Sequence, residues 1–460
     1  MSASTWSRSL AIVALLAPVV VRAQPSARSA AADSALIDAY VRPYVRSNNF
    51  SGQVLVARGG NVVFARAYGD ADRERHIANT LSTPMHVASL SMQFTAAAVL
   101  RLIDARLLTL DTRVASIVPS VRGGDSITIR NLLEQRSGLS DINARADYAA
   151  ILAQHQTPAS LVGFIANDTL RFAPGSTYQG EEHSAYNLLA LIIEKKTGLP
   201  FAAAMQQLVF APAGMTHSGV DDDSVPEPMH FARGYEPHGV SGLQPATSIH
   251  WSAKAGNGSA YLTGRDEVRW VRALFDGDFL SPGTRAVVAD TSGPTFGYGW
   301  FRRPNKRFGE FTYSVSGRAP GFASYVTYLP HSDLTVVVLS NVYSSAPTEI
   351  GSDVAAIMLG EPYDAFAPGA SLTSAVLRAL NGLAFTFPAD FYQPNATLTL
   401  SAKGREMFVH WPTGDLTPMI PLGRDHFLDR AYWEPIVIER DSTGRVVAMT
   451  YDRFRGTAAK

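Results

Sequence analysis

Residues 87–100 read VASLSMQFTAAAVL and place two serines at the start of a predicted helix. A serine hydroxyl becomes an effective nucleophile when a positioned base takes its proton. On a helix, the side chain three residues further along shares the same face and can supply that base. Here Ser89 is followed at this spacing by Met92, and Ser91 by Phe94. Neither of these side chains takes up a proton, so both candidate nucleophiles lack a base one turn away.

A second polar group, formed by Glu181, Glu182 and His183, precedes the helix predicted over 185–198. Carboxylates and imidazoles are common general bases in enzymes. If one of them lay within hydrogen-bonding reach of Ser89, the two would form a serine–acid or serine–histidine pair. Two simpler interpretations remain open. The three residues form a solvated polar loop, and Ser89 is only the N-cap of its helix.

Other polar motifs give weaker signals. Lys254 precedes a glycine-rich turn at 256–258 and is a candidate for a displaced base. The acidic run 221–223 could hold a cation, although a solvated acidic turn explains it more simply. No His-Glu-x-x-His motif suggests zinc, and 256–258 lacks the strand–helix context of a dinucleotide loop. The sequence therefore predicts neither a metal ion nor an organic cofactor.

The composition is that of an ordinary globular protein with a large core. Of the 460 residues, 46% are hydrophobic and 17% are charged. Lys and Arg together number 40, as do Asp and Glu, so no net charge favours a nucleic-acid partner. Cysteine is absent, which excludes disulfides, a thiol nucleophile and thiolate metal sites.

The first 23 residues have the pattern of a secretory signal peptide. Arg8 precedes an apolar run over 10–21, and residues 21–23 form a cleavage signal. The run is short for a membrane span, so export with cleavage is favoured over a retained anchor. We therefore expect a periplasmic or secreted bacterial protein, free of the membrane after cleavage, with a spacer over 24–34.

Strand patterns open and close the main part of the chain, and helical patterns fill its middle. Early and late strands that meet in one antiparallel sheet, with a helical insertion between them, would form an α+β domain. A linker rich in Pro, Ala, Gly and Ser over 363–372 precedes further alternating segments. These segments predict a small, separate β domain over 373–460. The strands of the main domain are predicted at 50–59, 60–69, 296–303, 311–317, 323–330 and 334–341.

Between residues 35 and 360 the chain resembles the serine β-lactamase-related family, which includes class C β-lactamases, penicillin-binding proteins, esterases and D-aminopeptidases. The resemblance implies a β-lactamase/transpeptidase-like fold over 35–362, with an antiparallel sheet flanked by helices and a helical lobe. The β domain resembles the C-terminal extensions of many members. The matching segments follow the family order: GQVLVARGGNVVFARAYG, HVASLSMQFTAAAVLRLIDARLLTLD, ITIRNLLEQRSGL, YNLLALIIEKKTG and SGRAPGFASYVTYLPHSDLTVVVLSN.

Two of the family's three catalytic motifs supply its proton-handling groups, and both are altered here. In Ser-x-x-Lys, Ser89 matches the nucleophile and Met92 matches the lysine. Methionine keeps the length and flexibility of the lysine stem without its charge. In Tyr-x-Asn, the matching positions hold Glu181, Glu182 and His183 when counted back from the following helix. Counted forward from the preceding Pro-Gly pair, the motif falls one residue earlier, and neither register preserves it.

The third motif, Lys/His-Thr/Ser-Gly, matches Val315, Ser316 and Gly317. Serine and glycine are kept, but a valine replaces the cation. The resemblance implies that the backbone of this strand forms half of an oxyanion hole, a role that needs no particular side chain.

Two functions of different class follow. The first is an exported, catalytically impaired family member that binds a peptide, muropeptide or acyl-type ligand in its cleft. The second is a working serine hydrolase of β-lactamase, esterase or D-aminopeptidase type, acylated at Ser89 with a non-standard base. Position 92 and the 181–183 loop distinguish the two.

Overall fold

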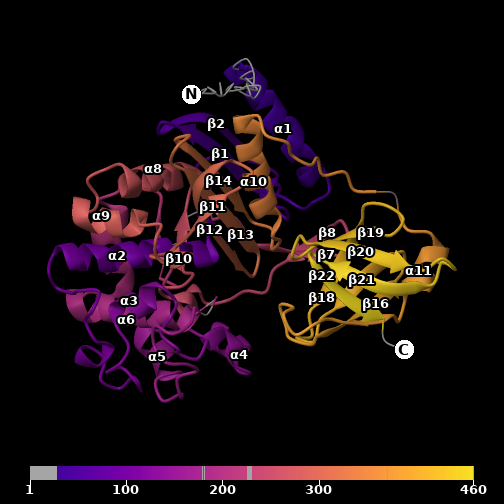
Figure 1. Ribbon diagram of the computed structural model, residues 1–460. Coiled ribbons are helices and arrows are strands. Elements are labelled where there is room, and N and C mark those ends of the chain that lie inside the picture. Colours follow the sequence, from indigo (N-terminus) through magenta and orange to yellow (C-terminus); the bar gives the residue numbers. More distant parts are fainter. Residues whose placement is uncertain (1–27, 179, 181, 225–230, 370, 459–460) are drawn as a thin grey trace, which may run out of the picture.

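Strands from both ends of the main domain pair in one sheet. The computed structural model describes residues 28–178, 180, 182–224, 231–369 and 371–458, so the predicted signal peptide and Glu181 lie outside it. Seven antiparallel strands run in the order β10-β11-β12-β13-β14-β1-β2 (Figure 1). The predicted meeting of early and late strands is confirmed, because β1 pairs with both β14 and β2. The strands are β1 Gly52–Arg58, β2 Asn61–Tyr68, β10 Phe296–Gly297, β11 Trp300–Asn305, β12 Glu310–Ala319, β13 Phe322–Leu329 and β14 Leu334–Ser340.

Helices cover both faces of this sheet. Val336 and Val338 of β14 belong to the core beneath α1 and α10, whereas Val337 and Leu339 belong to the core shared with α2 and α8. Successive strand residues point to opposite faces of the sheet. Because helices cover both faces, every residue of β14 is buried. The four helices are α1 Ala30–Arg46, α2 Met92–Asp104, α8 Gly264–Phe275 and α10 Ala346–Leu359.

The helical lobe carries the start of α2. The α-helix begins at Met92, and a 3₁₀ turn, η1 (Ala88–Ser91), precedes it. The predicted helix α6 ends at Gly198, whose φ of 70° allows the C-cap.

No helix in the described part of the chain is long and apolar enough to cross a membrane. The remaining elements are η2 Val114–Ser116, α3 Ile129–Leu133, η3 Ile142–Ala144, α4 Tyr148–Leu152, α5 Pro158–Gly163, α6 His183–Thr197, α7 Phe201–Met205, the π-helical η4 Gln206–Phe210, η5 Trp251–Lys254 and α9 Pro282–Ala289.

Short strands tie the lobe to the sheet. A three-stranded sheet, in the order β5-β9-β6, lies next to η1, since the backbone of Val87 bonds to Ala260 in β9. Two small hairpins complete the main domain. The strands are β3 Asp70–Asp72, β4 Ile77–Ala78, β5 Met85–His86, β6 Gly219–Val220, β7 Tyr235–His238, β8 Gly242–Pro245 and β9 Ala260–Leu262.

The C-terminal β domain is a closed eight-stranded barrel (Figure 1). Strand β15 pairs with β16 on one side and with β22 on the other, which closes the barrel and removes its edges. Its apolar core is separate from those of the main domain and includes Phe385, Phe427 and Tyr451. The elements are α11 Ser374–Leu380, β15 Ala384–Thr386, β16 Thr397–Lys403, β17 Glu406–His410, β18 Leu416–Pro421, β19 His426–Asp429, β20 Pro435–Arg440, β21 Val446–Tyr451 and β22 Phe454–Ala458.

The loop between β19 and β20 joins the barrel to the main domain. Arg430 in this loop is fully buried. Its guanidinium donates hydrogen bonds to Asn49 Oδ1 at 2.7 Å and to the carbonyl oxygens of Asn48 at 2.9 Å and Gly242 at 2.7 Å. It also bonds to the carbonyl oxygen of Gly239. The loop is therefore fixed against the main domain, at the edge of the cavity described next.

Candidate active site

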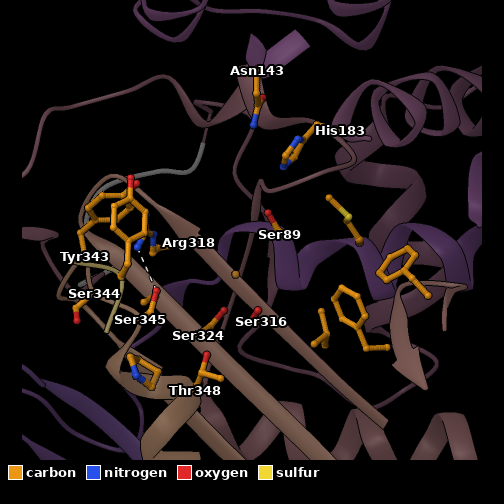
Figure 2. Close-up of a pocket in the computed structure, with 18 of the residues that line it drawn as sticks. Ser89, Asn143, His183, Ser316, Arg318, Ser324, Tyr343, Ser344, Ser345 and Thr348 are labelled. Carbon is orange, nitrogen blue, oxygen red and sulfur yellow. Dashed lines mark hydrogen bonds between the residues drawn. The ribbon is translucent and has the colours of Figure 1, made fainter. Parts of the chain in front are cut away.

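Ser89 lies in η1, at the entrance to α2, and lines a cavity of about 450 Å³ (Figure 2). Ala88 has a φ of 51°, in the left-handed region that non-glycine residues rarely adopt. Ser91, the other candidate nucleophile, is buried, and its Oγ accepts a hydrogen bond from the backbone N of Ala260 at 3.0 Å. Ser91 also holds the N-cap position of α2, so the N-cap interpretation of Ser89 is wrong.

Strand β12 passes this turn at backbone contact. A Cβ atom at Gly317 would lie 2.1 Å from the carbonyl oxygen of Val87 and 2.8 Å from the backbone N of Ser89, so only glycine fits. Strand β11 pairs with β12 only as far as Ser314, and η1 lies against the rest of β12. Unpaired strand backbone beside a serine is the arrangement that a backbone oxyanion hole requires.

Two apolar side chains stand where the resemblance expects cations. Met92 is 4% exposed, and its Sδ accepts a hydrogen bond from Gln135 Nε2 at 3.5 Å. Val315 is 3% exposed, and the two side chains line the same cavity as Ser89. Within the part of the chain that the structure describes, no side chain makes a hydrogen bond to the Ser89 hydroxyl. Ser316 is an exposed residue and lines the same cavity.

His183 is the first residue of α6 and also lines the cavity. Its Nδ1 lies 3.3 Å from each carboxylate oxygen of Asp141. A carboxylate only accepts hydrogen bonds, so Nδ1 is the donor and Nε2 stays free to take a proton. Figure 2 shows the imidazole pointing across the cavity towards Ser89. The His183–Asp141 pair could therefore act as a base if the side chains of His183 and Ser89 came together.

Glu182 has a structural position instead. It is fully buried, and its carboxylate accepts hydrogen bonds from Ser137 Oγ at 2.8 Å, from the backbone N of Ser137 at 3.2 Å and from that of Gly138 at 2.9 Å. Burial raises the pKa of Glu182 to about 7. It does not line the cavity. Of the predicted 181–183 group, His183 is the described residue that does.

The positive charge of the cavity comes from the residue that directly follows the third motif on β12. Among the described residues that line it, Arg318 is the only lysine or arginine, and none is an aspartate or glutamate. One lining residue, Tyr432, belongs to the barrel. The remaining lining residues are Gln135, Asn143, Phe296, Phe301, Ala323, Ser324, Tyr343, Ser344, Ser345, Pro347 and Thr348.

The family model for β-lactamases matches residues 37–356, well over half of the chain. The chain belongs to the β-lactamase family.

Its relatives within this family differ in the activities that their names describe. Esterase EstB of Burkholderia gladioli is 30% identical over 315 residues, covering 59% of this chain and 80% of the esterase. Penicillin-binding protein 4* of Bacillus subtilis is 28% identical over 340 residues, covering 69% and 74%. The D-aminopeptidase of Gluconobacter oxydans is 28% identical over 354 residues, covering 74% of this chain and 63% of that protein.

Solved structures show the same fold. The octameric penicillin-binding protein homologue of Pyrococcus abyssi superposes with a TM-score of 0.63 at 20% identity, covering 92% of this chain and 99% of that one. The D-amino acid amidase of Ochrobactrum anthropi also gives 0.63 at 20% identity, covering 72% and 99%. The match to the Pyrococcus abyssi structure extends beyond the main domain into the barrel.

The other polar motifs of this β-lactamase-family protein do not line the cavity. Lys254 Nζ donates a hydrogen bond to Tyr148 Oη at 2.6 Å, and burial lowers the pKa of the lysine to about 8. Lys254 does not line the cavity, but it packs close to η1, since a Cβ atom at Gly258 would lie 3.3 Å from Lys254 Cβ and 3.6 Å from the carbonyl carbon of Ala88. Within the acidic run, Asp221 bonds to His86 and Asp223 bonds to two other histidines. The described residues contain no group that could hold a metal ion.

Sequence reasoning missed four residues of the site: Asp141, Arg318, Tyr343 and Tyr432. One of them carried a usable signal. Arg318 stands two residues after Ser316 on a predicted strand, and alternate strand residues share a face. Asp141 and Tyr432 become neighbours of the site only through the tertiary fold, and no local pattern marks them.

Proposed function

We propose that this protein binds an acyl-type ligand, such as a peptide or muropeptide, in the Ser89 cleft without turning it over by the lysine- and tyrosine-assisted route of its family. One observation carries the proposal. The position of the lysine holds Met92, whose sulfur is already hydrogen-bonded to Gln135, and no described side chain bonds to the Ser89 hydroxyl. Without a base, a serine hydroxyl is a poor nucleophile.

Retention of the cleft supports the binding part of the proposal. The cavity of about 450 Å³ has the size of a small-ligand site. The contact between β12 and η1, which needs Gly317, is preserved although the catalytic cations are not. Relatives are named as a penicillin-binding protein, an esterase and a D-aminopeptidase, so the names describe different ligands or reactions. We also propose export, supported by the signal-peptide pattern of residues 1–23.

Covalent labelling tests the proposal directly. The mature protein is incubated with benzylpenicillin and with a fluorescent penicillin, and adducts are followed by intact-mass spectrometry. We expect no adduct at Ser89, and β-lactam hydrolysis no faster than in Ser89→Ala. Rapid formation of a Ser89 adduct would contradict the proposal.

A second candidate, a slow serine hydrolase, is favoured by the His183–Asp141 pair. In this reaction the Ser89 Oγ attacks the acyl carbonyl while His183 Nε2 takes its proton. The imidazolium, stabilised by Asp141, then returns that proton to the leaving group, and water later releases the acyl group by the same exchange. The imidazole would have to move within hydrogen-bonding distance of Ser89, since the two are not hydrogen-bonded.

The second candidate is tested with p-nitrophenyl acetate. It requires hydrolysis that is lost in Ser89→Ala and falls about 100-fold in His183→Asn, the usual effect of removing a general base. His155→Asn is the matched control, because His155 also pairs with an aspartate, at 2.9 Å, but lies outside the cavity. Hydrolysis that does not depend on Ser89 would contradict this candidate.

A further inference from the structure

Arg318 places a positive charge in the cavity that the family motifs do not account for. It lies on β12 two residues after Ser316, and alternate residues of a strand point to the same face. Both side chains line the cavity. Figure 2 shows Arg318 beside Tyr343 and Ser345, away from His183, with Ser89 between them.

The guanidinium of Arg318 is held in a fixed orientation. It lies between two tyrosine rings, 4.6 Å from the centroid of Tyr343 and 4.5 Å from that of Tyr432. Its Nη1 donates hydrogen bonds to the carbonyl oxygen of Ala431 at 2.7 Å and to Ser345 Oγ at 3.1 Å. Stacking and hydrogen bonding together pre-orient a planar group that binds carboxylates through two parallel N–H donors.

This cation has no anionic partner in the part of the chain that the structure describes. No carboxylate forms an ion pair with Arg318, and none lines the cavity. Arg307 provides a contrast, because it pairs with the buried Asp353 at 2.6 Å. A partly buried charge without a counter-ion is unfavourable, and an anion entering the cavity would relieve that cost.

We propose that Arg318 forms an anion subsite that binds a carboxylate carried by the ligand. The inference rests on the proposed function, which places the acyl part of that ligand at Ser89. The hydroxyls of Ser345 and Thr348 line the same region and can donate further hydrogen bonds to the carboxylate. The preferred ligand is therefore an acylated compound or peptide with a free carboxylate, and its amide binds less tightly.

The barrel completes this subsite. Tyr432 covers one face of the guanidinium, and Ala431 accepts one of its hydrogen bonds. Both residues belong to the loop between β19 and β20, which Arg430 fixes against the main domain. The C-terminal domain thus contributes to ligand selection as well as to packing.

A purely structural role for Arg318 makes a different prediction. If Arg318 only tied the barrel loop to the main domain, its loss would weaken binding of charged and neutral ligands equally. If it binds a carboxylate, its loss weakens only the charged ligands. Pairs of ligands that differ by one charge therefore separate the two roles.

The experiment measures binding to the full mature chain by isothermal titration calorimetry. The probes are N-acetyl-D-alanyl-D-alanine and its C-terminal amide, together with phenylacetate and phenylacetamide. We expect Arg318→Gln to weaken binding of each carboxylate about 10- to 100-fold, as for loss of a charge-assisted hydrogen bond, and to leave the amides unchanged. Arg318→Lys should retain part of the preference. Arg453→Gln is the matched control, because Arg453 also stacks on a ring, Phe454 at 4.5 Å, outside the cavity.

Each outcome decides between the proposals. Equal binding of carboxylate and amide by the native protein overturns the anion subsite and leaves cleft binding intact. An equal loss for both ligand forms in Arg318→Gln also overturns it, in favour of the structural role. Arg318-dependent binding of phenylacetate without binding of the dipeptide supports the subsite and contradicts the peptide part of the proposed function. Failure of both carboxylates to bind overturns the subsite.

Discussion

At the scale of single residues, Met92 does more than remove a base. Its side chain is part of the main core and accepts a hydrogen bond from Gln135, so the space beside Ser89 is adapted to a neutral side chain. Val315 is likewise buried. The two substitutions remove charge while leaving the packing of α2 and β12 in place, which separates loss of chemistry from loss of fold.

We therefore expect Met92→Lys to restore slow acylation of Ser89. The amine would stand one helical turn from the serine, and the apolar surroundings would lower its pKa towards neutrality, where it can accept the hydroxyl proton. Labelling by an activated acyl reagent should rise about 100-fold, at the low end for a general base. Intact-mass spectrometry over time measures the adduct, and Val315→His should increase its rate further.

Met92→Leu is the matched control for packing, and the double variant with Ser89→Ala should give no adduct. If the unchanged protein already labels at Ser89 as fast as the lysine variant, the missing base does not explain the site. The His183–Asp141 pair would then be the better account of the chemistry.

How much of the site the sequence could predict depends on the distance between partners. Ser89, Met92 and Val315 stand in short local patterns, so their positions at the cleft were predictable. His183 could be placed as a candidate, but its partner Asp141 is 42 residues away and was not found. Hydrogen bonds over such separations depend on how the helical lobe folds, and periodicity carries no information about that.

At the scale of elements, the packing of helices and strands decides details that local patterns leave open. The sequence predicted Ser89 and Ser91 at the start of a helix, yet α2 starts at Met92 after a 3₁₀ turn. The cause is tertiary: β12 approaches the turn at Gly317, and Ala88 adopts a left-handed φ. Of the strand order, the sequence could predict that the early and late strands share one sheet.

A carboxyl group buried between α2 and α8 should strongly affect how the free energy of unfolding depends on pH. Glu267 is fully buried, and its Oε1 accepts a hydrogen bond from Gln93 Nε2 at 3.0 Å, whereas Oε2 has no partner among the described residues. Burial raises the pKa of Glu267 to about 8. Because the folded pKa lies above the unfolded one, the folded state binds more protons between them.

The contribution of Glu267 to the free energy of unfolding should therefore be highest below about pH 4.5. It should fall as the pH rises towards about 8. Glu267→Gln keeps the shape and stays neutral, so it should remove this decline and be more stable by about 1–3 kcal/mol at pH 8. Urea denaturation at several pH values measures the difference. Glu361→Gln, on the loop after α10, is the control, and a parallel decline in Glu267→Gln would rule out the assignment.

At the scale of the whole molecule, the barrel is both a separate core and a wall of the cleft. Alternating segments predicted strands over 373–460, but the pairing of β15 with β22 joins the two ends of that region and leaves no mark in local pattern. Local sequence pattern does not predict how the barrel packs against the main domain either. This packing depends on Arg430, whose partners Asn48 and Asn49 lie 382 and 381 residues away.

Arg430→Met should loosen the barrel while leaving both domains folded. The change leaves Asn49 Oδ1 and the carbonyl oxygens of Asn48, Gly239 and Gly242 without this donor in a buried interface, at a cost of about 2–4 kcal/mol. Differential scanning calorimetry should then resolve two unfolding transitions, and proteolysis of the 363–372 linker should become faster.

Binding of carboxylates should weaken in the same variant, because Tyr432 follows Arg430 by two residues and covers Arg318. Arg424→Met is the matched control, since its side chain on the same barrel is 84% exposed. A loosened barrel with unchanged carboxylate affinity would show that Tyr432 does not contribute to the anion subsite. Unchanged calorimetry and proteolysis would show that the apolar contacts of the interface hold the barrel without Arg430.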